Sequence, residues 1–315
     1  MIMARKIIID TDPGQDDAIA ILAALASPED LEVLGIVGVA GNVPLPLSVL
    51  NALKIVEVSG RTGIKVFAGC ERPIRRDLVT AEYVHGKTGL DGPTLPDPVL
   101  KAEAQHGTDF IIEALRTHPE KSITLCPLGP LTNIAMAFIK APDVIGRVKE
   151  IVLMGGGYFE QGNATPAAEF NIFVDPDAAD VVFRSGVPIT QVPLDLSHQM
   201  LSTAARVKTF RELGNRAGVV TAELLDFFER FDEQKYGWDG GPLHDPCVIA
   251  WLLKPELFEG RQINVTIETA SELTIGATVA DYWGITNKPK NVFFLRNGDA
   301  DGYYKLLAER IARLP

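Results

Sequence analysis

Short runs of Ile and Val alternate along most of the chain with longer segments whose apolar residues recur at helical spacing. Short apolar runs indicate buried strands, whereas a period of about 3.6 residues indicates helices with one apolar face. The predicted strands cover residues 6–9, 31–39, 64–67, 123–128, 151–154 and 189–192. The predicted helices cover residues 18–26, 47–58, 109–115, 131–138 and 177–183.

This alternation predicts an α/β fold, because strands that are apolar throughout are typical of a parallel sheet covered by helices on both faces. Residues 197–231 are predicted to be mostly helical, and residues 236–246 are predicted to form a loop. Two further strands are expected over 263–267 and 292–295. Without an internal repeat or a linker, we expect a single domain over residues 1–315, with a mostly parallel Rossmann-like central sheet, flanking helices and additional C-terminal helices.

Residues 69–105 depart from this alternation. They are rich in Pro, Gly and charged residues and show little periodicity. Long loops in compact domains are frequently lids or binding loops. We therefore predict a long active-site loop here, one that closes over a substrate.

Composition narrows the function classes. The chain has 46% hydrophobic and 23% charged residues, as ordinary globular proteins do. Its formal net charge of −11 and its lack of a Lys/Arg run argue against nucleic acid as a partner and favour a small-molecule substrate. No segment approaches the roughly 18 uninterrupted apolar residues of a membrane span, and the N-terminal segment lacks the features of a signal peptide. Three cysteines without CxxC spacing suit reduced thiols, so we expect a cytoplasmic protein with no membrane partner.

Four carboxylates lie within eight residues where the first predicted strand meets the first helix. The two-residue period of a strand places Asp10 and Asp12 on one face, and a turn at Pro13-Gly14 lets the helix bring Asp16 and Asp17 back toward them. Offsetting the helix dipole would explain the last two carboxylates but not all four. Four such charges repel unless a cation joins them, and all-oxygen ligands favour Ca²⁺ or Mg²⁺. The segment therefore predicts a metal site.

The aspartate segment also fits another class of enzyme. A DxD sequence after a first strand also resembles the haloacid-dehalogenase-type phosphohydrolases. Those enzymes usually follow the second Asp with Gly-Thr or Gly-Val and use a Lys after a later strand, whereas Lys149 precedes its strand here.

The string DTDPGQDDA at residues 10–18 resembles the N-terminal signature of the inosine-uridine preferring nucleoside hydrolase family. Six further segments resemble the same family in the same order, at 39–42, 85–90, 129–133, 154–157, 163–171 and 244–246. The resemblance spans most of the chain. It implies Ca²⁺-dependent hydrolysis of the N-glycosidic bond of ribonucleosides to free base and ribose, by a homodimer or homotetramer. The non-enzymatic alternative is a nucleoside-binding protein that has lost the chemistry, against which the presence of Asp12, Asp17 and His244 argues.

The same resemblance implies roles for individual residues at the sugar end of the site. The implied Ca²⁺ ligands are Asp12, Asp17, Asp245 and the backbone carbonyl of Leu128, a position where other family members have Thr. Asp12 would also act as the general base on the attacking water, with Asp10 orienting the site from behind. The implied ribose-binding residues are Asp16, Asn42, Asn163, Glu169 and Asn171, with Met154 and Phe170 as an apolar floor.

At the base end, His85 and His244 resemble the base-facing histidines of the family, with His244 as the proton donor to the leaving base. Composition alone would make His85 a solvated loop residue, and would make the segment around Asn163 an ordinary polar loop. The helically spaced aromatic residues Phe227, Phe228 and Phe231, together with Tyr236 and Trp238, fit either a core face or a surface that stacks on the base. Two histidines favour an inosine-uridine or pyrimidine type, while purine or pyrimidine preference and the identity of the main proton donor stay open.

Overall fold

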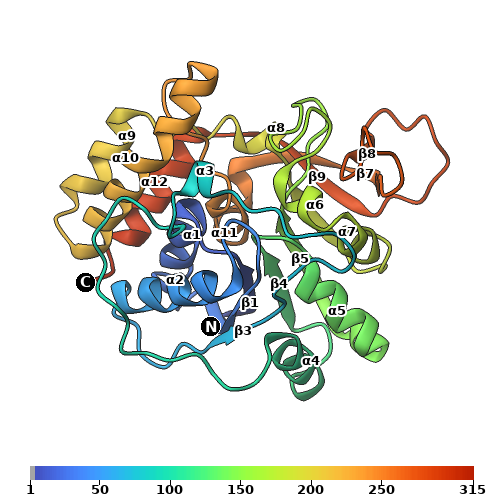
Figure 1. The fold of residues 1–315 in the computed structure, drawn as a ribbon, viewed down its shortest axis with the longest axis horizontal. Helices are drawn as coiled ribbons and strands as arrows, with labels where there is room; N and C mark the ends of the chain where they lie inside the picture. Colours follow the sequence, from blue (N-terminus) through green and yellow to red (C-terminus); the bar gives the residue numbers. More distant parts are fainter. Residues whose placement is uncertain (1–3) are drawn as a thin grey trace.

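A nine-stranded sheet runs through the protein, which a computed structural model describes over residues 4–315 (Figure 1). The strand order is β3-β2-β1-β4-β5-β6-β9-β7-β8, and all neighbours from β3 to β9 are parallel. Strand β7 pairs antiparallel with β9 and with β8. The strands are β1 (Arg5–Thr11), β2 (Leu31–Gly38), β3 (Val66–Ala68), β4 (Ile123–Pro127), β5 (Val148–Met154), β6 (Ile189–Val192), β7 (Phe258–Ile267), β8 (Thr278–Asp281) and β9 (Val292–Gly298).

Helices cover both faces of this sheet (Figure 1). In β1, Ile7 and Ile9 belong to one apolar core and Ile8 to the other, as the two-residue period of a strand requires. The first core includes α1 (Gln15–Leu25), α2 (Leu45–Val58), α9 (Ala204–Glu212), α10 (Arg216–Tyr236), α11 (Pro246–Leu253) and α12 (Ala300–Ile311). The second includes α4 (Gly107–Thr117), α5 (Thr132–Lys140) and α7 (Pro176–Phe183). The remaining short helices are α3 (Glu82–His85), α6 (Phe170–Val174), α8 (Leu194–Ser197), η1 (Pro142–Arg147) and η2 (Pro255–Leu257).

The order of the strands places a crevice next to β1. From β1 the chain passes outward to β2 and β3 on one side, whereas β4, β5 and β6 follow on the other. The loops after β1 and β4 therefore diverge, and open α/β sheets bind ligands at such a switch point, outside the carboxyl ends of the strands. Asp12 follows β1 and Leu128 follows β4, so both lie at this crevice.

The predicted fold class is confirmed, with differences at particular elements. Residues 236–246 were predicted as a loop, but α10 continues to Tyr236, ends at Gly237 with a φ of 68°, and α11 begins at Pro246. The sequence PCVIAWLL of α11 is apolar almost throughout, because the helix is buried, so it shows no helical period. The predicted strand over 64–67 is observed two residues later at its start, as β3. Strand β8 was not predicted.

Residues 69–105 contain α3 and no strand of the sheet. Within residues 4–315, no helix is both long and apolar enough to cross a bilayer. The segment assessed for a signal peptide begins with residues 1–3, which lie outside the described residues.

Candidate active site

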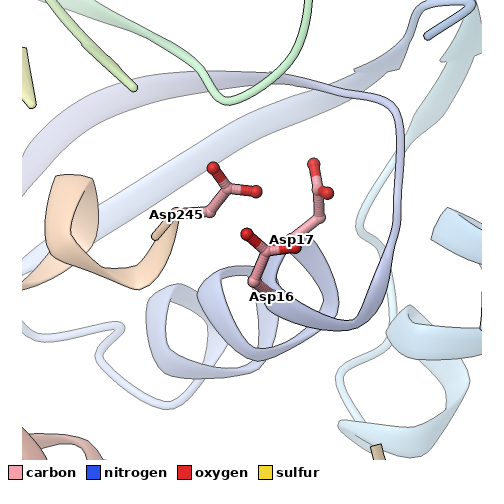
Figure 2. A group of neighbouring side chains, drawn as sticks. All are labelled: Asp16, Asp17 and Asp245. Carbon is pink, nitrogen blue, oxygen red and sulfur yellow. The ribbon is translucent and has the colours of Figure 1, made fainter. Parts of the chain in front are cut away.

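Three aspartates converge at the crevice (Figure 2). Asp16 and Asp17 lie in the first turn of α1, and Asp245 directly precedes α11, which packs against α1. Each of the three offers a carboxylate oxygen within 4.8 Å of the others. All three side chains are buried. Three acidic groups from two distant segments therefore form one compact set of oxygen donors.

Hydrogen bonds from neighbouring residues fix the orientations of the Asp17 carboxylate and of the nearby Asp12 carboxylate. Thr11 Oγ1 donates to Asp17 Oδ1 at 2.5 Å, and the Gly14 backbone N–H donates to Asp17 Oδ2 at 3.0 Å. The Asn42 backbone N–H donates to Asp12 Oδ2 at 2.7 Å. Asp12 Oδ1 has no hydrogen-bond partner among the described residues, although it is fully buried. That oxygen is thus free for a ligand.

The Asp12 carboxylate lies against two glycines, which have no side chain to fill the space that it occupies. A Cβ atom at Gly41 would lie 2.0 Å from Asp12 Oδ2, and one at Gly129 would lie 2.2 Å from Asp12 Oδ1. These positions follow β2 and β4, the strands on either side of β1. Both glycines are therefore required for close approach to the carboxylate, whatever their backbone conformation.

Burial makes the ionised form of these carboxyl groups costly. It is the largest cause that raises the pKa of Asp16 to about 8, with the charge of Asp17 second. Burial and then Asp17 raise the pKa of Asp12 well above its ordinary value. Burial also raises the pKa of Asp245, with Asp16 as the next cause. Within residues 4–315, no Lys or Arg forms an ion pair with any of them, so a positive charge from elsewhere is needed to keep them all ionised.

The residues present fit a hard divalent cation. The donors are all oxygens, and both Asp12 Oδ1 and Asp16 Oδ1 are buried without a hydrogen-bond partner among the described residues. The three carboxylates within 4.8 Å of one another differ from the predicted ligand set. They include Asp16, which the resemblance assigned to ribose binding, and they do not include Asp12. Asn171 Nδ2 donates to the Leu128 carbonyl at 2.6 Å, which leaves that oxygen one further lone pair. The buried acidic cluster is thus a candidate metal centre.

Asp10 lies behind this cluster. Asn133 Nδ2 donates to Asp10 Oδ2 at 2.8 Å, while Asp10 Oδ1 has no partner among the described residues. Burial raises the pKa of Asp10 to about 8. Asn133 also accepts from the Cys70 backbone N–H at 2.7 Å, so it joins the start of the long loop to the end of β1.

A cavity opens beside the acidic cluster and gathers most of the predicted site residues. Its lining includes Asp16, Asn42, His85, Leu128, Met154, Asn163, Glu169, Phe170, Asn171, His244 and Asp245. Asp10, Asp12 and Asp17 do not line it and are fully buried next to it. Strand ends, the long loop and the start of α11 therefore contribute to one site.

The polar side of the cavity is built around the start of α6. Glu169 caps this helix, accepting from the backbone N–H groups of Asn171 at 2.9 Å and Ile172 at 3.2 Å, and from that of Gly156 at 2.9 Å. Asn163 Oδ1 accepts from the Phe170 backbone N–H at 2.9 Å. The segment that composition would make an ordinary polar loop is thus folded against the cavity. The Gly155–157 turn brings its backbone to the Glu169 carboxylate, which leaves no open phosphate loop.

His85 reaches the cavity from α3, inside the long loop. Its Nδ1 lies 2.7 Å from Gln15 Oε1, and Gln15 Nε2 donates back to the His85 carbonyl at 3.0 Å. An amide oxygen accepts, so this pairing places the proton on Nδ1 and leaves Nε2 as an acceptor. Burial lowers the pKa of His85 to about 3. His85 is therefore a buried neutral side chain and not the solvated residue that composition alone suggested.

His244 also lines the cavity and directly precedes Asp245 in the chain. Its Nδ1 is 2.7 Å from Ser197 Oγ, at the end of α8. Burial, followed by the neighbouring His198 and His85, lowers the pKa of His244 well below its ordinary value. The neutral ring keeps one N–H, which can donate to a ligand in the cavity or to Ser197.

Aromatic residues also line the cavity. Of the five whose role the sequence left open, Phe228, Phe231 and Tyr236 line the cavity. Trp238 stacks on Tyr236 with ring centroids 4.8 Å apart, outside the lining. Phe227 instead packs under Arg230, whose guanidinium lies 3.6 Å from its ring centroid. The cavity thus combines aromatic faces with imidazole groups, as a site for a planar heterocycle would.

Several residues of the site were not predicted from the sequence. His198 and Tyr83 line the cavity, and Gln15 holds His85. His198 follows β6, so the rule that α/β sites gather at the carboxyl ends of strands could have suggested it. Tyr83 and Gln15 gave no such signal, because their contacts depend on how the long loop packs.

The chain is similar to proteins of known family and structure. The sequence pattern of the family described as inosine-uridine preferring nucleoside hydrolase matches residues 7–305. A pyrimidine-specific ribonucleoside hydrolase, RihA of Photobacterium profundum, is 46% identical over 98% of this chain and 99% of its own length. A solved purine-preferring ribonucleoside hydrolase from Gardnerella vaginalis is 35% identical, with a TM-score of 0.91 and 98% coverage of both chains. A solved plant nucleoside hydrolase is 33% identical, with a TM-score of 0.90 and coverage of 98% of this chain and 99% of its own. The chain, with its acidic cluster at the end of β1, belongs to the inosine-uridine preferring nucleoside hydrolase family.

Proposed function

We propose that this protein hydrolyses the N-glycosidic bond of uridine, cytidine and inosine to free base and ribose, in a Ca²⁺-dependent reaction, with pyrimidine nucleosides preferred. Membership of the family makes it a hydrolase that acts on N-ribosyl bonds. One observation carries the finer proposal: buried carboxylates without a countercharge adjoin a cavity that aromatic and imidazole groups also line. The 46% identity to a pyrimidine-specific relative supports the base preference.

The acidic cluster would bind the cation and the sugar. Asp12, Asp17 and Asp245, with the Leu128 carbonyl, would hold Ca²⁺. When bound, Ca²⁺ would neutralise the carboxylates and bring the ribose hydroxyls and the attacking water together. Asp16, Asn42, Asn163, Glu169 and Asn171 would bind the ribose hydroxyls, and Met154 and Phe170 would lie against the apolar face of the ring.

Asp12 would take the proton from the attacking water. Its Oδ2 is fixed by the Asn42 N–H while Oδ1 has no partner among the described residues, so one oxygen positions the group and the other can accept. Asp10, held by Asn133, would orient the site from behind. Loss of the base leaves an oxocarbenium-like sugar, which the fixed hydroxyl contacts stabilise more than they stabilise the substrate.

The charge on the departing base would be neutralised by a proton from a residue that lines the cavity. His244 in its protonated form would transfer a proton to the base and return to the neutral ring that burial favours, with Ser197 fixing the ring. His85 would accept from or pack against the base. Phe228, Phe231 and Tyr236 would contact its faces. We further propose that the long loop bearing His85 closes over the substrate, and that the enzyme acts in the cytoplasm as a homodimer or homotetramer.

The proposal is tested by measuring reducing-sugar and base release from uridine, cytidine, inosine and adenosine, and phosphate release from their 5′-monophosphates. The expected result is release of ribose from the nucleosides, fastest with uridine and cytidine. Phosphate release alone would support a phosphohydrolase, and binding without release would support a nucleoside-binding protein. Faster release from inosine than from both pyrimidines would overturn the proposed base preference.

Gly129→Ala should lower kcat/KM for uridine at least about 100-fold, because displacing a catalytic group by about 1 Å is enough for such a loss. The added methyl would lie 2.2 Å from Asp12 Oδ1 and force the carboxylate aside. Gly146→Ala is the matched control, since a Cβ there meets no atom within 4 Å. Steady-state kinetics of both variants check this, and equal activities would contradict the proposed role of Asp12.

A further inference from the structure

His198 is a cavity residue that the mechanism above does not use. It follows α8 directly, and its side chain is largely buried in the cavity wall. Its ring centroid lies 5.9 Å from that of His244 and 4.9 Å from that of Trp238. Trp238 in turn stacks on Tyr236, so His198 lies beside the aromatic residues of the cavity. It therefore borders the end of the cavity that would receive the part of a nucleoside remote from ribose.

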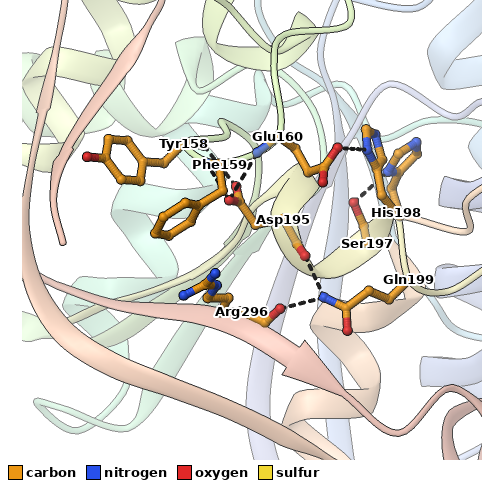
Figure 3. Close-up of polar contacts among 9 residues, drawn as sticks. Tyr158, Phe159, Glu160, Asp195, Ser197, His198, Gln199 and Arg296 are labelled. Atoms are coloured by element: carbon orange, nitrogen blue, oxygen red, sulfur yellow. Dashed lines mark hydrogen bonds and ion pairs between the residues drawn. The ribbon is translucent and has the colours of Figure 1, made fainter.

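A carboxylate fixes the orientation of this ring (Figure 3). His198 Nδ1 lies 3.2 Å from Glu160 Oε2. A carboxylate only accepts, so Nδ1 carries the proton and Nε2 of the neutral ring presents a lone pair. Burial lowers the pKa of His198, although Glu160 acts in the opposite direction. The lowered pKa favours the neutral form of the ring. Nε2 makes no hydrogen bond to any other described residue, so it remains available to a ligand.

The pair is itself anchored to the sheet (Figure 3). The carboxylate of Asp195 in α8 accepts from the backbone N–H groups of Tyr158 at 2.8 Å, Phe159 at 2.6 Å and Glu160 at 3.3 Å. Gln199 Nε2 donates to the Asp195 carbonyl at 2.6 Å and to a carbonyl of β9 at 2.5 Å. The turn bearing Glu160 and the helix that His198 follows are thus locked together. A ring held in this way suits recognition, because little freedom is lost when a ligand binds.

We propose that His198, oriented by Glu160, is a specificity-determining residue whose Nε2 accepts a hydrogen bond from an N–H group on the base edge remote from ribose, such as N3–H of uracil. This inference rests on the proposed function, since it assigns the base end of the same cavity. A site that pairs a buried acceptor with a donor of the substrate rejects analogues lacking that donor, because the acceptor is then left unpaired.

The test compares uridine with 3-methyluridine, which lacks the N3–H donor, in the wild type and in His198→Ala. The wild type should prefer uridine by at least about tenfold in kcat/KM. His198→Ala should lose about tenfold with uridine, mainly through KM, and nothing with 3-methyluridine, so the preference collapses. Glu160→Ala should weaken the preference partially, because the ring loses its anchor. His118→Ala, a histidine outside the cavity, should keep the wild-type ratio.

The ratio of the two substrates does not depend on how much of a preparation is folded, so a poorly folding variant still gives an answer. A wild-type preference retained in His198→Ala would overturn the inference. An equal fall in kcat for both substrates would also overturn it, because it would show that His198 acts through His244 on the chemical step. No release from uridine by the wild type would instead contradict the proposed function.

Discussion

Asp12→Asn should lower kcat/KM for uridine by at least about 10³-fold while the protein stays folded. The amide cannot take a proton from water, and general base catalysis alone is worth about 10² to 10⁴-fold. The same change weakens the proposed cation site, since an amide brings no negative charge. Steady-state kinetics at saturating Ca²⁺ check the expected loss.

Stability separates this loss from misfolding. Burial and Asp17 hold the pKa of Asp12 above its value in the unfolded chain, so ionising it at neutral pH costs folding free energy. Asn removes that cost, and the variant without cation should unfold at a temperature no lower than the wild type. Asp143→Asn, the same change at an exposed carboxylate paired with Arg116, should leave kcat/KM unaltered. Near-normal turnover by Asp12→Asn would rule out Asp12 as the base.

His244→Ala should lower kcat for uridine by about 10² to 10⁴-fold, the range expected for a positioned proton donor. Uracil is a poor leaving group unless a donor neutralises the charge that develops on it. The measurement is kcat for uridine beside kcat for 4-nitrophenyl β-D-ribofuranoside, whose phenolate leaves without protonation. The variant should retain most of its activity on the second substrate.

The pair of substrates distinguishes a proton donor from a residue that shapes the cavity. Ser197→Ala, which removes the hydrogen bond to His244 Nδ1, should give a smaller loss in the same direction. A loss below about tenfold with uridine, or equal losses with both substrates, would contradict the role of His244 in neutralising the base.

The sheet and the acidic segment could be predicted from local sequence because both depend on short-range patterns. Ile7, Ile8 and Ile9 are apolar in succession, which indicates a strand covered on both faces, and the structure places them in two opposite cores. The carboxylates follow immediately, so strand geometry alone brings Asp12 to the end of β1. The order of the strands makes that end a crevice.

The remainder depends on contacts between distant segments. Gln15 and His85 lie 70 positions apart, and no local pattern shows that one holds the other. The convergence of Asp16 with Asp245 depends on α11, a buried helix without a helical period. The contact between His198 and Glu160 joins residues 38 positions apart, and no local pattern predicts it.

The most direct test of the account is ribose release from uridine after divalent cations are removed by chelation and Ca²⁺ is then added back. Activity should vanish on removal and return with one Ca²⁺ bound per chain. Ca²⁺ should also raise the unfolding temperature, because it relieves the repulsion among Asp12, Asp16, Asp17 and Asp245. Full activity in the protein without cations, or recovery without Ca²⁺ binding, would contradict the proposed Ca²⁺ dependence.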